Sequence, residues 1–403
     1  MSATAPLVTI GIPSFQCADF IAEAIASALG QDCTDLEVLV IDDASTDSTM
    51  DVIRGFDDPR LHVLVNAANV GPARNWNRIL DEARGRYVKV MGADDILLPG
   101  SVSAEVAAME ANPDVAMVTG PRVLITERGR RIMRRGNGGL RGRVSGTVAG
   151  REMVRRGTNL IGEPCAALLR MSAVRDVGSF DEAAAYCIDM DMWLRLLERG
   201  DLYVLGEPVC AYRIVSTSWS TTVATTQQAD VTRLLHSYAA RGAFGTTDAD
   251  ADAGARHAAT LVIGRRLLYR ALFDQETRRR LLYLAVGGWN TLFGYLAFAG
   301  LYYLIGEGLG YVPVFIVSYA LSMLNAYWGY KLVVFRSPGK FHQEFPRFAI
   351  VYVVALGVNL VVFPWLTRSL GLNPYLSQAI FTVALIVCTY FVNSRFSFRQ
   401  EPA

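Results

Sequence analysis

The C-terminal third of the chain contains four long apolar stretches, at about residues 281–305, 312–335, 347–369 and 374–396. A helix needs about 20 apolar residues to cross a bilayer, and each stretch is long enough. Soluble proteins rarely contain four core helices of this length in succession. We therefore predict a bundle of four transmembrane helices. Inside a bilayer the backbone polar groups must be hydrogen-bonded within the protein, and a helix achieves this within each segment.

Basic residues are concentrated on one side of these stretches. The loops on the other side, Gly306–Tyr311 and Arg368–Pro374, contain a single Arg between them. Cytoplasmic loops of membrane proteins carry an excess of Lys and Arg, so we expect both chain termini to be cytoplasmic. The basic residues on that side are Arg278–Arg280, Lys331, Arg336, Lys340, Arg347, Arg395 and Arg399.

The charge of the chain is divided between its two parts. From Arg278 onward the net charge is about +7, whereas the preceding part carries about −6. An acidic, water-soluble part is typical of an enzyme and argues against a nucleic-acid binder. The apolar run Leu7–Ile12 is too short for a signal peptide, so we expect this part in the cytoplasm. The six cysteines form no CxxC pair and are interpreted as packed thiols.

The first 120 residues alternate between strand and helix patterns. Alternation of this kind predicts a mostly parallel, doubly wound α/β sheet, in which ligands bind at the carboxyl ends of the strands. The predicted strands are Leu7–Pro13, Leu36–Asp43, Leu61–Asn66 and Arg86–Gly92, and the predicted helices are Phe20–Leu29, Thr46–Gly55 and Pro72–Ala83.

Polar residues follow these strands. Asp42 and Asp43, with Ser45 shortly after them, either bind a ribose or base edge, or form a turn and helix cap. Asp94 and Asp95 either bind Mg²⁺ or Mn²⁺, which take one or two carboxylates plus phosphate oxygens, or form a turn.

A second acidic pair, Asp189 and Asp191, lies where a helix over Met190–Arg199 is predicted to begin. One carboxylate can cap the helix while the other serves as a general base toward an acceptor hydroxyl. An acceptor phosphate is already anionic, and for it Arg or Lys contacts would matter more than a base.

The rest of the chain gives weaker signals. Arg122–Gly150 is rich in Arg and Gly and is interpreted as a flexible basic loop, either a solvated insertion or a lid or contact with an anionic membrane. Strands are predicted at Ala166–Leu169 and Leu202–Ile214, and an acidic linker at Asp248–Ala255. We expect a catalytic domain over 1–250, a linker with a basic helix over 251–279, and a membrane domain over 280–400. Each apolar stretch contains one Asn, either for hydrogen bonds between helices or for a polar path through them: Asn290, Asn325, Asn359 and Asn393.

These motifs, in this order, resemble the family 2 glycosyltransferases of the GT-A fold over residues 6 to 220. The resemblance implies inverting transfer of a sugar from a nucleotide-sugar donor, with a divalent metal, Mg²⁺ or Mn²⁺, on the diphosphate. The chain departs from the family pattern at Gly92, where the metal motif usually begins with Asp, at Ile188, which replaces a Glu, and at Ile214–Ser216, where many members place a His. The matching motifs are Pro13–Gln16, Gln31–Asp32, Val40–Asp47, Asn69–Gly71, Ala73–Asn75, Ala93–Asp95, Gly162–Pro164, Gly178–Asp181 and Asp189–Trp193.

The resemblance also implies roles for individual residues. Asp189 and Asp191 are the catalytic candidates, with Asp189 in the position of the base, and Asp94 and Asp95 are the metal ligands. The nucleotide-sugar site is assigned Pro13, Ser14, Asp42, Asp43, Ser45, Arg74 and Asp94, and the acceptor side is assigned Gly162, Glu163, Pro164 and Trp193.

The segment from about Arg280 to Arg399 resembles the GtrA-like membrane family, which is associated with moving polyprenyl-linked sugars during cell-surface polysaccharide synthesis. The combination implies a multi-pass protein of the bacterial inner membrane that acts on polyprenyl phosphate or a lipid-linked glycan. Internal repetition in this segment, where Tyr327–Arg336 resembles Tyr390–Arg399, is compatible with a homo-oligomer. The alternative is a translocase or scaffold whose soluble domain only binds nucleotide sugar.

Overall fold

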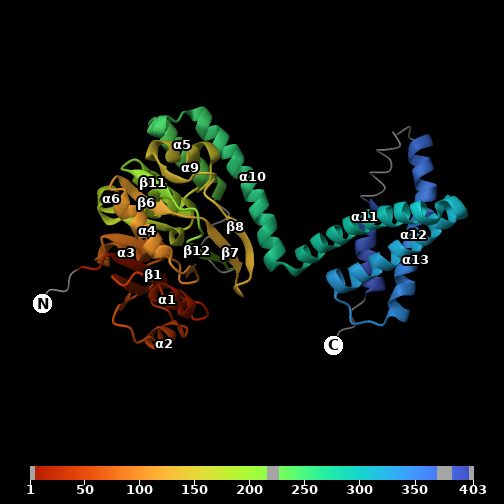
Figure 1. The fold of residues 1–403 in the computed structure, drawn as a ribbon, viewed down its shortest axis with the longest axis horizontal. Helices are drawn as coiled ribbons and strands as arrows, with labels where there is room; N and C mark the ends of the chain where they lie inside the picture. Colours follow the sequence, from red (N-terminus) through yellow and green to blue (C-terminus); the bar gives the residue numbers. More distant parts are fainter. Residues whose placement is uncertain (1–4, 216–226, 370–383, 399–403) are drawn as a thin grey trace. The chain divides into compact units, whose positions relative to one another are not determined.

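The computed structural model describes residues 5–215, 227–369 and 384–398 (Figure 1). The chain divides into two compact units, Met1–Gly264 and Arg265–Ala403. The division falls within 251–279, the segment expected to be a linker. The acidic segment Asp248–Ala255 is not an irregular linker, because it forms the first turns of α10 (Asp248–Phe273).

The N-terminal unit is built on an eight-stranded sheet of order β3-β2-β1-β4-β10-β6-β11-β9. Its first four strands are parallel and alternate with helices, as predicted. β2 is buried along its whole length, which explains why its sequence is almost continuously apolar. These elements are β1 (Val8–Ser14), α1 (Ile21–Leu29), β2 (Leu36–Asp42), α2 (Thr49–Arg54), β3 (Leu61–Val65), α3 (Pro72–Glu82) and β4 (Tyr87–Val90).

The second half of this sheet is mixed. β10 (Ala167–Arg170) is antiparallel to both β4 and β6 (Val115–Thr119). Because its direction is reversed, the residues just before β10 lie at the edge where β4 and β6 end. The other elements here are α4 (Ser101–Ala111), β9 (Gly142–Val144), α5 (Gly146–Arg156), α6 (Met171–Val177), α7 (Ile188–Leu197), β11 (Asp201–Val204) and α9 (Gln227–Ala240).

A second, four-stranded sheet has the order β5-β12-β7-β8. It comprises β5 (Ile96–Leu97), β7 (Arg122–Thr126), β8 (Arg131–Arg135) and β12 (Cys210–Ile214). The prediction of a flexible loop over Arg122–Gly150 is therefore wrong: the segment forms the β7–β8 hairpin, β9 and the start of α5. Three buried apolar residues, Val123–Ile125, anchor β7, whereas β8 is held by backbone pairing that its Arg-rich sequence does not reveal.

The C-terminal unit is helical in its described part. The segment Gln275–Ile305 of α11 (Gln275–Leu309) is long and apolar enough to cross a membrane, in agreement with the first predicted span. The second and third predicted spans coincide with helices, and the fourth lies partly outside the described residues. The remaining helices are α12 (Tyr311–Gly329), the π-helix Tyr330–Phe335, α13 (Phe341–Arg368), a helix over 384–392 and the π-helix Asn393–Ser397.

Hydrogen bonds between helices involve the predicted Asn residues. Asn325 donates to Asn290 Oδ1 over 3.1 Å, and Asn393 bonds Tyr283 over 3.4 Å. These contacts favour helix packing over a polar path, while the Asn359 side chain lies outside the described residues.

The sequence repeat has a structural counterpart in the same unit. Tyr327, near the end of α12, donates to Glu344 Oε2 at the start of α13 over 3.1 Å. Tyr390, in the helix over 384–392, donates to Glu276 Oε1 at the start of α11 over 2.6 Å. Each of these Tyr residues lies just before a π-helix. Two equivalent Tyr–Glu hydrogen bonds therefore connect the helices of this unit, one between α12 and α13 and one between the helix over 384–392 and α11.

Candidate active site

The predicted site residues gather at one edge of the large sheet. The parallel strands β1, β2 and β4 all end there, and the antiparallel β10 begins there. This arrangement brings the segments after β2 and β4 to the same edge as the Gly162–Ala166 segment before β10. Strand direction alone thus joins parts of the chain that are more than a hundred residues apart.

Asp42 is the last residue of β2 and is fully buried. Its carboxylate accepts hydrogen bonds from Ser14 Oγ at 3.0 Å, Ser45 Oγ at 2.6 Å and Ser45 N at 2.8 Å. Pro13 and Ser14 pair with Ile41 and Asp42 in the register of the two strands. The structure therefore brings together four predicted nucleotide-side residues: Pro13, Ser14, Asp42 and Ser45.

Asp43 faces a different loop. Its carboxylate accepts bonds from Asn66 Nδ2 at 2.7 Å, Val70 N at 2.9 Å and Gly71 N at 3.0 Å. These contacts fix the loop that leads into α3, the helix that carries Arg74. Arg74 is exposed and its Nε donates to Glu182 over 3.1 Å. Asp43 thus positions the Arg74 helix.

Asp94 and Asp95 lie beside Gly92 just after β4. A Cβ on Gly92 would lie 2.8 Å from Asp94 Oδ1 and 3.0 Å from Asp95 Oδ2, so both carboxylates approach the same point. Burial raises the pKa of Asp94, and burial together with the Asp94 charge raises that of Asp95. Among the described residues, neither carboxylate forms an ion pair. The departure at Gly92 therefore has a steric reason, because the carboxylates occupy the space of a side chain there.

Arg213 holds this pair from β12. Its backbone N–H donates to Asp95 Oδ1 over 3.1 Å, and its Nε donates to the Asp94 carbonyl over 2.8 Å. The predicted strand end Tyr212–Arg213 thus has a role that sequence analysis did not assign.

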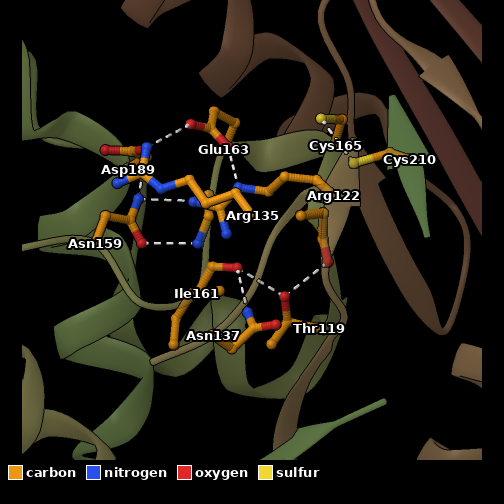
Figure 2. A network of polar contacts seen from close by, with 12 residues as sticks. Thr119, Arg122, Arg135, Asn137, Asn159, Ile161, Glu163, Cys165, Asp189 and Cys210 are labelled. Carbon is orange, nitrogen blue, oxygen red and sulfur yellow. Dashed lines mark hydrogen bonds and ion pairs between the residues drawn. The ribbon is translucent and has the colours of Figure 1, made fainter. Parts of the chain in front are cut away.

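Glu163 lies immediately before the short 3₁₀-helix Pro164–Ala166 and is bonded by arginines of the β7–β8 hairpin (Figure 2). Arg122 Nε donates to Glu163 Oε2, and Arg135 Nη1 lies 3.9 Å from Oε1. Burial alone would raise the pKa of Glu163, but the charges of Arg122 and Arg135 outweigh it and hold the pKa below its usual value. Glu163 is thus an anion at neutral pH.

Asp189 lies at the start of α7 and is electrostatically coupled to Glu163. Asn159 Nδ2 donates to Asp189 Oδ2 over 2.8 Å, and Met190 N donates to Oδ1 over 2.7 Å (Figure 2). Burial and the Glu163 charge raise the pKa of Asp189 to about 7 against these two hydrogen bonds. The Glu163 charge also raises the pKa of Asp95. Glu163 is therefore close enough to both Asp95 and Asp189 for its charge to act on each of them.

Asp191 is separated from this group. Its carboxylate accepts from Arg195 Nε over 2.8 Å, one turn along α7. Two residues span about 200° around a helix, so Asp191 and Asp189 project from nearly opposite faces. Asp191 therefore forms an ion pair within α7, whereas Asp189 interacts with the charge of Glu163.

The remaining acceptor-side candidates support the backbone. Trp193 is buried, and its Nε1 donates to the Gly162 carbonyl over 3.0 Å. Gly162 has φ 114°, and a Cβ there would lie 2.9 Å from Arg122 Cζ, so only glycine fits. Pro164 begins the 3₁₀-helix that leads into β10.

Besides Arg213, three other site residues were missed as individual candidates: Arg122, Arg135 and Asn159. Arg122 and Arg135 are opposite each other in the β7–β8 register. The only signal for Arg122 was its place shortly after an apolar strand, and nothing in the sequence distinguishes Arg135 from its Arg neighbours. Asn159 is recognisable only through its contact with Asp189.

Two family models match the chain. Residues 9–178 match "Glycosyl transferase family 2", and residues 282–398 match "GtrA/DPMS, transmembrane domain". The protein MT1568 of Mycobacterium tuberculosis is 29% identical over 230 residues, which are 55% of this chain and 72% of that protein.

Other matches are shorter or more distant. The Escherichia coli protein WfaP, a UDP-Glc:alpha-D-GlcNAc-diphosphoundecaprenol beta-1,3-glucosyltransferase, is 35% identical over 104 residues, 26% of this chain and 41% of WfaP. Among solved structures, S. aureus TarS 1–349 matches with a TM-score of 0.49 and 17% identity, covering 78% of this chain and 91% of that one.

Proposed function

We propose that this chain, which joins a family 2 glycosyltransferase domain to a GtrA/DPMS-type transmembrane domain, transfers a sugar with inversion from a nucleotide-sugar donor to a membrane-bound acceptor. The acceptor class is a polyprenyl phosphate or a lipid-linked glycan. The observation that carries the proposal is the position of Glu163, which couples the Asp94–Asp95 pair to a carboxylate with a raised pKa, Asp189.

The donor side comprises the β1 and β2 ends. Ser14 and Ser45 hold Asp42 at a fixed position at the sheet edge, where an open α/β sheet binds nucleotides. Arg74, exposed on the helix that Asp43 positions, supplies a positive charge on the same side.

Asp94 and Asp95 fit a divalent cation. They offer two close carboxylates without an ion-pair partner among the described residues, and Mg²⁺ or Mn²⁺ commonly takes one or two carboxylates together with phosphate oxygens. A cation bound there would neutralise the charge that develops on the leaving diphosphate. Glycine at position 92 lets both carboxylates approach the same point, where a side chain would collide with them.

Asp189 is proposed as the general base for a hydroxyl acceptor. The acceptor oxygen bonds to the anomeric carbon, the bond from that carbon to the diphosphate oxygen breaks, and its electron pair leaves with the nucleoside diphosphate. Asp189 takes the hydroxyl proton. A base with a pKa of about 7 suits this task, because it is ionised in a large fraction of molecules at neutral pH and still binds a proton well.

Arg122 and Arg135 are proposed to line the acceptor side. Arg122 is fully buried, and its Nη1 has no hydrogen-bond partner in the described part of the chain. A buried donor of this kind is costly unless a ligand satisfies it. A glycan hydroxyl or a phosphate oxygen would do so.

The membrane domain is proposed to anchor the enzyme beside its lipid acceptor, in the bacterial inner membrane with four spans and both termini cytoplasmic. The basic residues that flank its apolar stretches on one side support this orientation. Synthesis of a cell-surface polysaccharide is the process that such an arrangement would serve.

The proposal is tested with full-length protein in membranes that contain polyprenyl phosphate or a lipid-linked glycan. A panel of nucleotide sugars is supplied with Mg²⁺ or Mn²⁺, and the lipid product is identified by its mass. For a hydroxyl acceptor, Asp189→Asn should lower turnover by about 10²- to 10⁴-fold while donor binding persists. The matched variant Asp191→Asn should retain turnover.

Three outcomes would change the proposal. Full turnover of Asp189→Asn with a hydroxyl acceptor would show that Asp189 is not the base. Transfer to polyprenyl phosphate that survives Asp189→Asn but is lost in Arg122→Gln would identify a phosphate acceptor. Donor binding without transfer or hydrolysis for every sugar would favour the alternative, a translocase or scaffold that only binds nucleotide sugar.

A further inference from the structure

The tip of the β7–β8 hairpin carries positive charge for which the described residues provide no carboxylate partner. Residues 122–143 include eight Arg and one acidic residue, Glu127. Three arginines outside the tip have carboxylate partners: Arg122 and Arg135 contact Glu163, and Arg143 contacts Asp201. The tip arginines differ: within the described residues no side-chain hydrogen bond or ion pair is found for exposed Arg128, Arg130 and Arg131.

Exposed arginines elsewhere in the same unit are commonly paired. Arg54 contacts Asp51, Arg86 contacts Glu110 and Arg241 contacts Glu198. The hairpin tip therefore differs from these positions, because it concentrates several arginines that have no partner in the described part of the chain.

The tip is held rigidly. Thr126 N donates to the Arg130 carbonyl over 2.9 Å, and Gly129 N donates to the Thr126 carbonyl over 2.9 Å. Gly129 adopts φ 72°, which completes a tight turn. Buried Arg213 donates from Nη1 to the Glu127 carbonyl over 2.8 Å and ties the turn to the domain. Binding would cost little backbone conformational entropy, because the turn is already formed.

An apolar side chain accompanies these charges. Met133 lies on β8, the edge strand of its sheet, and is 51% exposed. The strand register puts Met133 on the same face as Arg135, and a register shift separates it from Arg131, which pairs with Ile125. Exposed guanidinium groups around an exposed thioether suit the headgroup region of a bilayer, where charges meet lipid phosphates and apolar groups reach the acyl boundary.

We propose that this hairpin tip docks on the anionic headgroups of the membrane that anchors the C-terminal unit. The positive charges of Arg128, Arg130 and Arg131 favour an anionic surface. The transmembrane domain on the same chain keeps the hairpin within reach of a membrane. The base of the same hairpin carries Arg122 and Arg135, so docking would turn the acceptor side of the proposed site toward the lipid. The docking rests on membrane anchorage and does not depend on which sugar is transferred.

The test uses full-length protein in nanodiscs of phosphatidylcholine alone or of equal parts phosphatidylglycerol and phosphatidylcholine. Amide hydrogen exchange of residues 127–135 is measured by mass spectrometry. Exchange should slow by on the order of tenfold in the anionic nanodiscs. The protection should disappear in about 1 M salt, where the screening length falls to about 3 Å. It should also disappear in the triple variant Arg128→Gln, Arg130→Gln, Arg131→Gln.

A second triple variant serves as the control. Arg54→Gln, Arg175→Gln and Arg199→Gln remove the same charge from exposed positions elsewhere and should leave the protection intact. Equal exchange of the hairpin in both lipids would overturn the proposal. The proposal would also be overturned if exchange in the neutral nanodiscs slowed only when a soluble polyanion such as heparin was added. That result would indicate that the hairpin binds an anionic polymer. Because exchange requires no turnover, failure here is distinguishable from failure of the proposed transfer.

Discussion

Asn159 offers the sharpest test of the catalytic assignment, because it contacts the proposed base without being a base itself. Its Nδ2 donates to Asp189 Oδ2 over 2.8 Å and stabilises the ionised carboxylate. Asn159→Ala removes this bond. A hydrogen bond to a charged group contributes about 1.5–3 kcal/mol, and one pKa unit corresponds to about 1.4 kcal/mol. The pKa of Asp189, about 7 in the native protein, should therefore rise by about one to two units.

The sign of the effect on rate follows from the role of a base, which must be ionised to accept a proton. A native enzyme with its base at a pKa of about 7 should gain activity as pH rises through 7. In Asn159→Ala the same rise should occur about one to two units higher, with a loss of about five- to fiftyfold at pH 7 that is recovered as the pH passes the new midpoint of about 8–9. Initial rates at saturating donor and acceptor, measured across pH, give the midpoint directly.

A structural role for Asn159 would give a different profile. Asn159 also donates from Nδ2 to the Gly162 carbonyl and accepts from Gly162 N at Oδ1, so its loss can disturb the neighbouring backbone. Such a disturbance would lower the plateau at high pH without moving the midpoint. An unmoved midpoint in Asn159→Ala would refute the coupling between this amide and the base.

Three further predictions concern other parts of the chain. Gly92→Ala puts a methyl group 2.8 Å from Asp94 Oδ1 and should weaken activation by Mg²⁺ or Mn²⁺ by on the order of tenfold, measured by metal titration of activity. Burial, against the opposing charge of Lys89, raises the pKa of Glu105 to about 7, so the folded state binds this proton more tightly than the unfolded state and stability should fall as pH rises from about 4.5 to about 7. Glu105→Gln should flatten that decline in thermal unfolding curves. Tyr390→Phe removes the bond to the carboxylate at the start of α11 and should destabilise the membrane domain by about 1.5–3 kcal/mol, measured by unfolding in detergent.

The alternating first half of the catalytic domain could be predicted from sequence because each of its strands is a short apolar run ending in polar residues. The same logic located Asp42, Asp94 and Asp95 at one sheet edge. The β7–β8 hairpin could not be predicted in this way, since the pattern of β8 is basic and its order comes from pairing with β7. Periodicity reports burial, and β8 is largely exposed.

The site was predicted more accurately in its backbone positions than in its side-chain roles. Asp189 and Asp191 are equivalent by composition, and only the helix face and the Arg195 contact separate them. Likewise, the sequence predicts that Asp43 binds the nucleotide. In the structure its carboxylate accepts hydrogen bonds from Asn66, Val70 and Gly71. Roles that depend on a partner distant in sequence are not visible in local motifs.

The Tyr390–Glu276 contact has a consequence for the order in which the membrane domain is completed. Its two residues are 114 positions apart: Glu276 lies in the first turn of α11, and Tyr390 lies in the helix over 384–392. During synthesis α11 must therefore wait for the helix over 384–392 before the Glu276 carboxylate receives the tyrosine hydroxyl. A deletion that removes Tyr390 would consequently also disturb the beginning of the domain, where Glu276 lies.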